Sequence, residues 1–231
     1  MRSRCFILCM FFIPGISMLY GQATNIHTLD FYPAFGNSDL VLADSVYKLK
    51  SGDSIRFETL KFYISNIELL YGDKTVWKEE NSFHLLDAAN EKSLHISLTG
   101  APNIPVIEIK FNVGIDSVTN VSGVMGGDLD PTKGMYWTWQ SGYINFKLEG
   151  KSNMSKSRNN EFQFHLGGYE FPFNSCQTIV LNSTSAKPTI TIDIERFVNE
   201  IDFANENHIM TPGKEAVLLS KKLVSVFSIK E

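Results

Sequence analysis

The sequence predicts an all-β protein, an antiparallel β-sandwich or barrel-like domain with one C-terminal α-helix. Three observations predict this fold class. Apolar and polar residues alternate along most of the chain, turns rich in glycine and aspartate separate the alternating segments, and the clearest helical spacing lies near the C-terminus. Many strands without helical crossovers between them favour antiparallel pairing.

Strands are predicted wherever the apolar period is two. In residues 107–113, apolar side chains alternate with Glu108, Lys110 and Asn112, so that one face points to the core and the other to water. Residues 142–148 and 190–194 show the same alternation. Further strands are expected at residues 28–32, 55–70, 83–86, 162–166 and 178–181, with turns at 51–53, 71–73, 126–128 and 149–150.

A helix is predicted after residue 211. Thr211 suits an N-cap, and Pro212 suits the first helical position, where its missing N–H costs nothing. A shorter helix is expected at residues 196–203. Because the chain shows no internal repeat and no linker, residues 23–231 are predicted to form a single domain. The apolar residues that recur at three- and four-residue steps in the C-terminal helix are Ala216, Leu219, Leu223 and Phe227.

The N-terminal residues 1–22 have the pattern of a secretory signal peptide. Arg2 and Arg4 precede an almost unbroken apolar run, and small and polar residues follow at 21–23. The run is too short for a stable transmembrane span, and Cys9 lacks the small preceding residue of a lipid-anchor motif. We therefore expect a protein exported to the periplasm or beyond the cell, without stable membrane insertion.

Composition excludes several classes of function. The formal net charge is −4, and no block of lysine and arginine is present, so nucleic acid and anionic membranes are poor candidate partners. After removal of the signal peptide Cys176 is the one remaining cysteine, which cannot close an intramolecular disulfide. The sequence has no nucleophile elbow, P-loop, dinucleotide-binding glycine pattern or zinc-protease helix, which predicts a binding protein and not an enzyme.

Several segments, in a fixed order, carry a family resemblance. They begin with FYISNIELL at residues 62–70 and SFHLLD at 82–87. FNVGIDS at 111–117 leads through GDLDP at 127–131 and GMYWTW at 134–139 to Gly142 and Tyr143, and FQFHLGGY follows at 162–169. Together they resemble the MbnP-like family of exported copper-binding proteins.

The resemblance implies a β-rich envelope protein that binds one copper ion. Relatives use imidazole ligands, and His84 and His165 lie in segments that match the family. In some relatives a tryptophan beside the metal is oxidised to kynurenine by a partner that resembles di-haem cytochrome c peroxidases. In this sequence Trp137 and Trp139 lie in a matching segment, and which of them corresponds to the modified residue is left open.

The histidines have their own chemistry beside the resemblance. On a strand, His84 points away from Phe83 and Leu85, and His165 points away from the row of Phe164, so both could line a site. The alternative is that both are polar strand residues with local hydrogen bonds. His208 and Met210 place an imidazole and a thioether on one side of an extended segment, a pair that suits a soft metal ion, whereas a loop histidine and a core methionine explain them equally.

Two further patterns lie between residues 116 and 143. On a continuous strand, Met135, Trp137, Trp139, Ser141 and Tyr143 would share one face, as core residues or as a ribbon of mostly oxidisable side chains.

Asp116, Asp128 and Asp130, in a loop with Gly126 and Gly127, could hold calcium, or they could cap their own backbone turns. The rival to copper binding is therefore a structural or adhesive β-sandwich that binds a protein or glycan, with or without calcium.

Overall fold

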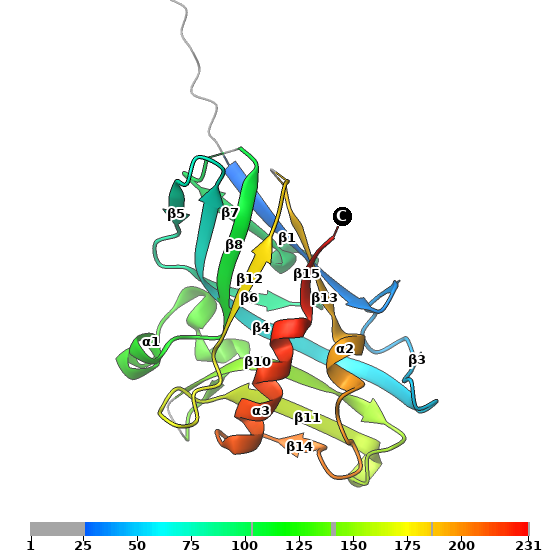
Figure 1. Cartoon of the computed structure of the whole chain (residues 1–231). Helices are drawn as coiled ribbons and strands as arrows, with labels where there is room; N and C mark the ends of the chain where they lie inside the picture. Colours follow the sequence, from blue (N-terminus) through cyan, green and yellow to red (C-terminus); the bar gives the residue numbers. More distant parts are fainter. Residues whose placement is uncertain (1–25, 103, 140–141, 186, 231) are drawn as a thin grey trace, which may run out of the picture.

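The computed structural model describes residues 26–102, 104–139, 142–185 and 187–230. Its described strands form two sheets that pack face to face (Figure 1). The predicted signal peptide lies outside the described residues. The described part of the chain contains no helix long and apolar enough to span a membrane.

The larger sheet is built around β4 (Ser54–Tyr71), an 18-residue strand. On one side of β4, β8 (Val106–Val113) pairs with the C-terminal half of the strand and β10 (Gly142–Ser152) pairs with its N-terminal half. Strands β3, β5 and β6 pair with the other side of β4. The remaining bounds are β3 Tyr47–Lys48, β5 Val76–Lys78, β6 Phe83–Asp87, β9 Tyr136–Trp137, β11 Glu161–Gly167, β12 Gln177–Asn182 and β14 His208–Ile209. The order along the sheet is β12-β8-β4-β10-β11-β14, and β9 pairs with β10.

The smaller sheet has the order β15-β13-β1-β2, with β7 also paired to β1. Its strands are β1 Ile26–Phe35, β2 Ser38–Asp39, β7 His95–Thr99, β13 Thr189–Asp193 and β15 Phe227–Lys230. The prediction of an all-β fold is confirmed. Two pairs, β1 with β13 and β11 with β14, are parallel, so the antiparallel pairing is not complete.

The main core lies between the sheets. Phe31 of β1 meets Phe111 of β8 edge-on at 5.9 Å, and Phe227 of β15 meets Phe62 of β4 at 6.0 Å. A second cluster covers part of the opposite face of the large sheet, where the segment between β8 and β10 crosses it. Its buried members are Tyr63, Leu85, Ile115, Leu129, Met135, Trp137, Tyr143 and Ile144. Residues 62–65 of β4 are therefore buried on both faces, as in the interior of a layered protein.

Three helices have α geometry in the described residues: α1 (Ser117–Ser122), α2 (Ile194–Val198) and α3 (Lys214–Lys222). In Figure 1, α3 crosses in front of the large sheet, and it contacts β11 through buried Ala216 and Leu219. The C-terminal helix is confirmed, but Gly213 is its N-cap, and Phe227 belongs to β15. The shorter helix begins at Ile194 and not at Arg196, because Asp193 caps it.

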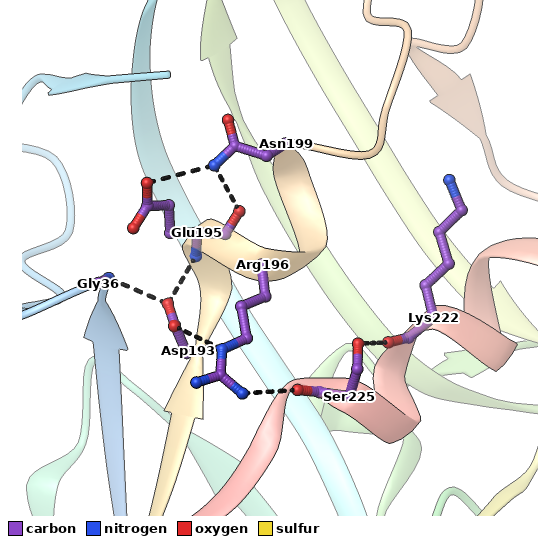
Figure 2. A network of polar contacts seen from close by, with 7 residues as sticks. All are labelled: Gly36, Asp193, Glu195, Arg196, Asn199, Lys222 and Ser225. Atoms are coloured by element: carbon purple, nitrogen blue, oxygen red, sulfur yellow. Dashed lines mark hydrogen bonds and ion pairs between the residues drawn. The ribbon is translucent and has the colours of Figure 1, made fainter. Parts of the chain in front are cut away.

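A polar network joins the smaller sheet to α2 and to the turn after α3 (Figure 2). The Asp193 carboxylate accepts hydrogen bonds from the backbone N–H of Gly36 at 3.0 Å and of Glu195 at 3.1 Å, and from Arg196 Nε at 3.0 Å. The Arg196 guanidinium also donates to the Ser225 carbonyl at 3.3 Å. One carboxylate therefore fixes the start of α2 against β1 and, through Arg196, against the chain that leads into β15.

The turn predicted at residues 149–150 is wrong. Strand β10 continues to Ser152, with a register irregularity between Glu149 and Gly150 where it pairs with β4. The irregularity replaces the turn because Gly150 lies against the Arg56 carbonyl and has no side chain to prevent that approach.

Candidate metal centre

His165 lies near the middle of β11 on the face opposite the main core. Its neighbours Phe164 and Leu166 are buried between the sheets, and His165 pairs with Lys147 of β10. The residue is nevertheless only 5 % exposed. A buried imidazole on the outer face of a sheet needs partners for both ring nitrogens.

Only one nitrogen of the His165 ring has a partner within the described residues. His165 Nε2 lies 2.7 Å from Glu149 Oε1, whereas Nδ1 is buried without a hydrogen bond. The bond to His165 lowers the pKa of Glu149 to about 2, so this carboxylate is charged and acts as the acceptor. Nε2 is therefore the nitrogen that donates its N–H to Glu149, and Nδ1 is the ring nitrogen left to bind a ligand.

Strand β14 brings the other predicted soft ligands to the same edge. It runs parallel to β11, with His208 beside Gln163 and Ile209 beside Phe164. Continuing this register by one residue places Met210 beside His165, at the usual strand spacing of about 4.8 Å. His208 is exposed and Met210 is half-buried. Strand β14 therefore brings His208, and by this extension of the register Met210, beside the strand that carries His165.

Trp137 lies next to this edge. It is 6 % exposed, and a Cβ atom added to Gly167 would come within 2.6 Å of its ring. Gly167 follows His165 by two residues, so both positions share the outer face of β11. The interpretation of Trp137 as a core residue is supported, and its ring packs beside the His165 position.

The prediction of a continuous strand through residues 135–143 is wrong. Strand β9 contains only Tyr136 and Trp137, and Trp137 pairs with Gly142 across a hairpin. Period-two alternation in sequence cannot reveal that the chain reverses. Trp139 therefore lies outside the strand and is 62 % exposed, with its ring centroid 5.9 Å from that of Trp137.

The structure does not bring His84 to His165. His84 lies on β6, which pairs with β4 on the edge opposite β10, so β4 and β10 separate the two histidine strands. Three strand spacings correspond to roughly 14 Å, too far for both rings to bind one ion at bonds of about 2 Å. The expectation of a joint ligand pair is therefore wrong. His84 Nε2 instead lies 2.8 Å from Glu79 Oε2, which also accepts a hydrogen bond from Ser82.

The three loop aspartates are engaged locally. Asp116 caps α1 through Thr119, Asp130 accepts from Thr132 N–H at 2.8 Å, and Asp128 accepts from Leu85 N–H at 3.1 Å and Lys133 Nζ at 2.6 Å. No group of three or more histidine, cysteine, aspartate or glutamate side chains converges on a metal position in the described ranges. The backbone-capping interpretation explains Asp116 and Asp130, and the calcium interpretation gains no support.

Sequence reasoning missed Glu149, because it placed this residue in a turn. The signal that could have revealed it is the continued alternation of Lys147, Glu149 and Lys151 beyond Leu148. Extending the strand by that pattern would have put a carboxylate on the outer face beside β11.

The fold and the site define a two-sheet β protein with a buried histidine that offers one ring nitrogen at a sheet edge. The sequence matches the family model described as MbnP over residues 24–211, and the chain belongs to this family. MbnP from Methylosinus trichosporium has a similar fold, with a TM-score of 0.63 and 13 % sequence identity over 84 % of this chain and 87 % of that chain. No curated protein matches the sequence.

Proposed function

We propose that this protein binds copper in the cell envelope, for acquisition, storage or delivery, with His165 Nδ1 as the central ligand. The observation that carries the proposal is the buried Nδ1 atom, which has no hydrogen-bond partner in the described residues, on a ring whose other nitrogen is fixed by Glu149. Metal-binding histidines commonly donate their second ring N–H to a carboxylate, which fixes the tautomer and raises the basicity of the ligand nitrogen. Family membership supports copper as the metal.

The neighbouring donors fit a soft ion. Met210 supplies a thioether and His208 a second imidazole from the adjacent strand, and thioether sulfur favours Cu(I). When bound, copper would satisfy the Nδ1 lone pair that the folded chain leaves open. His84 is not part of this set.

Titration with Cu(I) against a competing chelator tests the proposal. We expect His165→Ala to weaken Cu(I) binding by more than about 100-fold, a larger loss than removal of an outer hydrogen-bond partner causes. Met210→Leu should cause a smaller loss that is specific to Cu(I) over Cu(II), because only the soft thioether is removed.

Two histidine variants serve as matched controls. His95 and His84 each contact a carboxylate at 2.8 Å, and His165 does so at 2.7 Å, but the first two lie outside the β11–β14 edge. His95→Ala and His84→Ala should retain the wild-type affinity. Equal affinities for wild type and His165→Ala, or a loss confined to His84→Ala, would contradict the proposed centre.

We further propose that Trp137, and not Trp139, is the tryptophan susceptible to oxidation by a di-haem cytochrome c peroxidase-like partner. Its ring packs beside the proposed copper centre, whereas Trp139 is exposed to solvent. Peptide mass spectrometry after co-expression with such an enzyme should locate kynurenine at residue 137 in wild type and in Trp139→Phe. Kynurenine only at residue 139 would contradict this assignment.

Export is proposed from residues 1–22 together with family membership. N-terminal sequencing of the protein recovered from the periplasm or medium should begin close to Ala23. Retention of the whole chain in the cytoplasm would contradict it.

A further inference from the structure

A pocket of about 280 Å³ opens beside Trp137, where the β9–β10 hairpin, the end of β11 and the segment before α3 meet. Three aromatic residues line it, Trp137, Tyr169 and Phe173, together with the acidic Glu170. The remaining lining residues are Gly142, Gly168 and Pro212. Neither His165 nor Met210 lines the pocket, which shares only Trp137 with the surroundings of the proposed copper centre.

Glycine at two positions permits this arrangement of the walls. A Cβ atom on Gly142 would lie 3.2 Å from the Tyr169 ring, and one on Gly168 would lie 2.5 Å from the Phe173 carbonyl oxygen and 3.0 Å from Pro212. Gly168 also has a φ of +117°, a conformation that other residues rarely adopt. The loop after β11, which carries Tyr169 and Phe173, therefore packs closely against the β9–β10 hairpin and the segment before α3.

The lining of the pocket carries one negative charge. Glu170 is the one charged residue among those that line the pocket. The charge that lines the pocket itself is therefore negative, which favours a cation over an anion.

We propose that this pocket binds a small organic cation with a methylated ammonium group. Aromatic walls attract a quaternary ammonium through the negative faces of their rings, and the Glu170 carboxylate adds direct charge attraction. A sugar would need several hydrogen-bonding side chains around its hydroxyl groups, and the lining supplies only those of Trp137, Tyr169 and Glu170. The volume suits a head group of choline size, because drug-sized ligands occupy pockets of roughly 300–1,000 Å³.

Calorimetric titration of the copper-free mature protein with choline and with tetramethylammonium tests the proposal, with tryptophan fluorescence as a second readout. Both cations should bind, and 3,3-dimethylbutan-1-ol, the neutral isostere of choline, should bind at least about tenfold more weakly. Phe173→Ala should weaken choline binding by about tenfold, and Glu170→Gln should weaken it and reduce its dependence on salt.

Phe171→Ala is the matched control, because Phe171 lies in the same loop, is 97 % exposed and does not line the pocket. This variant should bind choline as wild type does. Three results would each overturn the proposal: no binding of either cation at millimolar concentration, equal binding of the neutral isostere, or equal losses in Phe171→Ala and Phe173→Ala. Binding of glucose or cellobiose without binding of choline would indicate a glycan site instead.

Discussion

Glu149 determines which ring nitrogen of His165 is left to bind a ligand. Its carboxylate holds Nε2 at 2.7 Å and leaves Nδ1 as the open atom. Glu149→Gln removes the charge and keeps the shape, so we expect Cu(I) affinity to fall by about 10- to 100-fold. The measurement is a chelator competition, with circular dichroism to verify folding.

Glu79→Gln is the control for that change, because Glu79 holds the His84 ring in the same way at 2.8 Å. It should leave Cu(I) affinity unchanged. An unaltered affinity in Glu149→Gln, or matching losses in the two variants, would show that the Glu149 contact does not prepare a ligand.

Cys176 is half-buried, and this partial burial lowers the reactivity of its thiol. Burial, with a smaller contribution from Asp116, raises the pKa of the Cys176 thiol from its ordinary 9.0 to about 12. At pH 8.5 the native thiolate population is then lower by about a thousandfold than for a free thiol, since each pKa unit is a factor of ten.

We therefore expect iodoacetamide to alkylate Cys176 more than about tenfold more slowly in the folded mature protein than in urea, as measured by mass spectrometry. The direction of the pH effect on folding follows from the same shift. Between pH 9 and 12 the unfolded chain releases this proton first, so rising pH favours unfolding. Equal alkylation rates in the two states would contradict the burial of the thiol.

At the scale of elements, the approach of the β9–β10 hairpin to β11 depends on Gly167. A Cβ atom there would lie 2.6 Å from the Trp137 ring and 2.7 Å from the Tyr143 carbonyl oxygen, and the latter is backbone that cannot rotate away. Gly167→Ala should therefore destabilise the protein by about 1–3 kcal/mol, as overpacking of a tight site usually does.

Gly72→Ala provides the comparison, because no heavy atom lies within 4 Å of a Cβ atom at that position. Urea unfolding of both variants measures the difference. If Gly167→Ala were as stable as Gly72→Ala, the close packing of Trp137 on β11 would be wrong.

Strands could be predicted from the sequence where one face is buried and the other is exposed, because apolar and polar residues then alternate. The alternation in residues 109–113 correctly predicted β8, because one row of β8 packs in the core and the other faces outward. The expected core position of Ile107 is wrong, since Ile107 is 42 % exposed and Val106 is buried in its place. The segment around Trp137 was mispredicted, since a hairpin reversal leaves the same alternating pattern as a straight strand. Strand β10 was ended too early because a glycine at an irregularity resembles a glycine at a turn.

At the scale of the whole molecule, topology decides which predicted ligands meet. His84 and His165 both lie in predicted strands, but the order β6-β4-β10-β11 depends on long-range pairing that no local pattern encodes. The meeting of β14 with β11 was equally hidden, although His208, Met210 and His165 were each identifiable by their chemistry. Residue types therefore identified the candidate metal ligands, but only the order of the strands in the sheet shows which of them lie close together.

The central claim is that copper binds His165 Nδ1 at the β11–β14 edge. Anomalous diffraction at the copper absorption edge, from crystals of the copper-loaded protein, tests it most directly. We predict a peak about 2 Å from His165 Nδ1, with Met210 among the neighbouring atoms. A peak at His84, or one at this edge that does not contact the His165 ring, would contradict the claim.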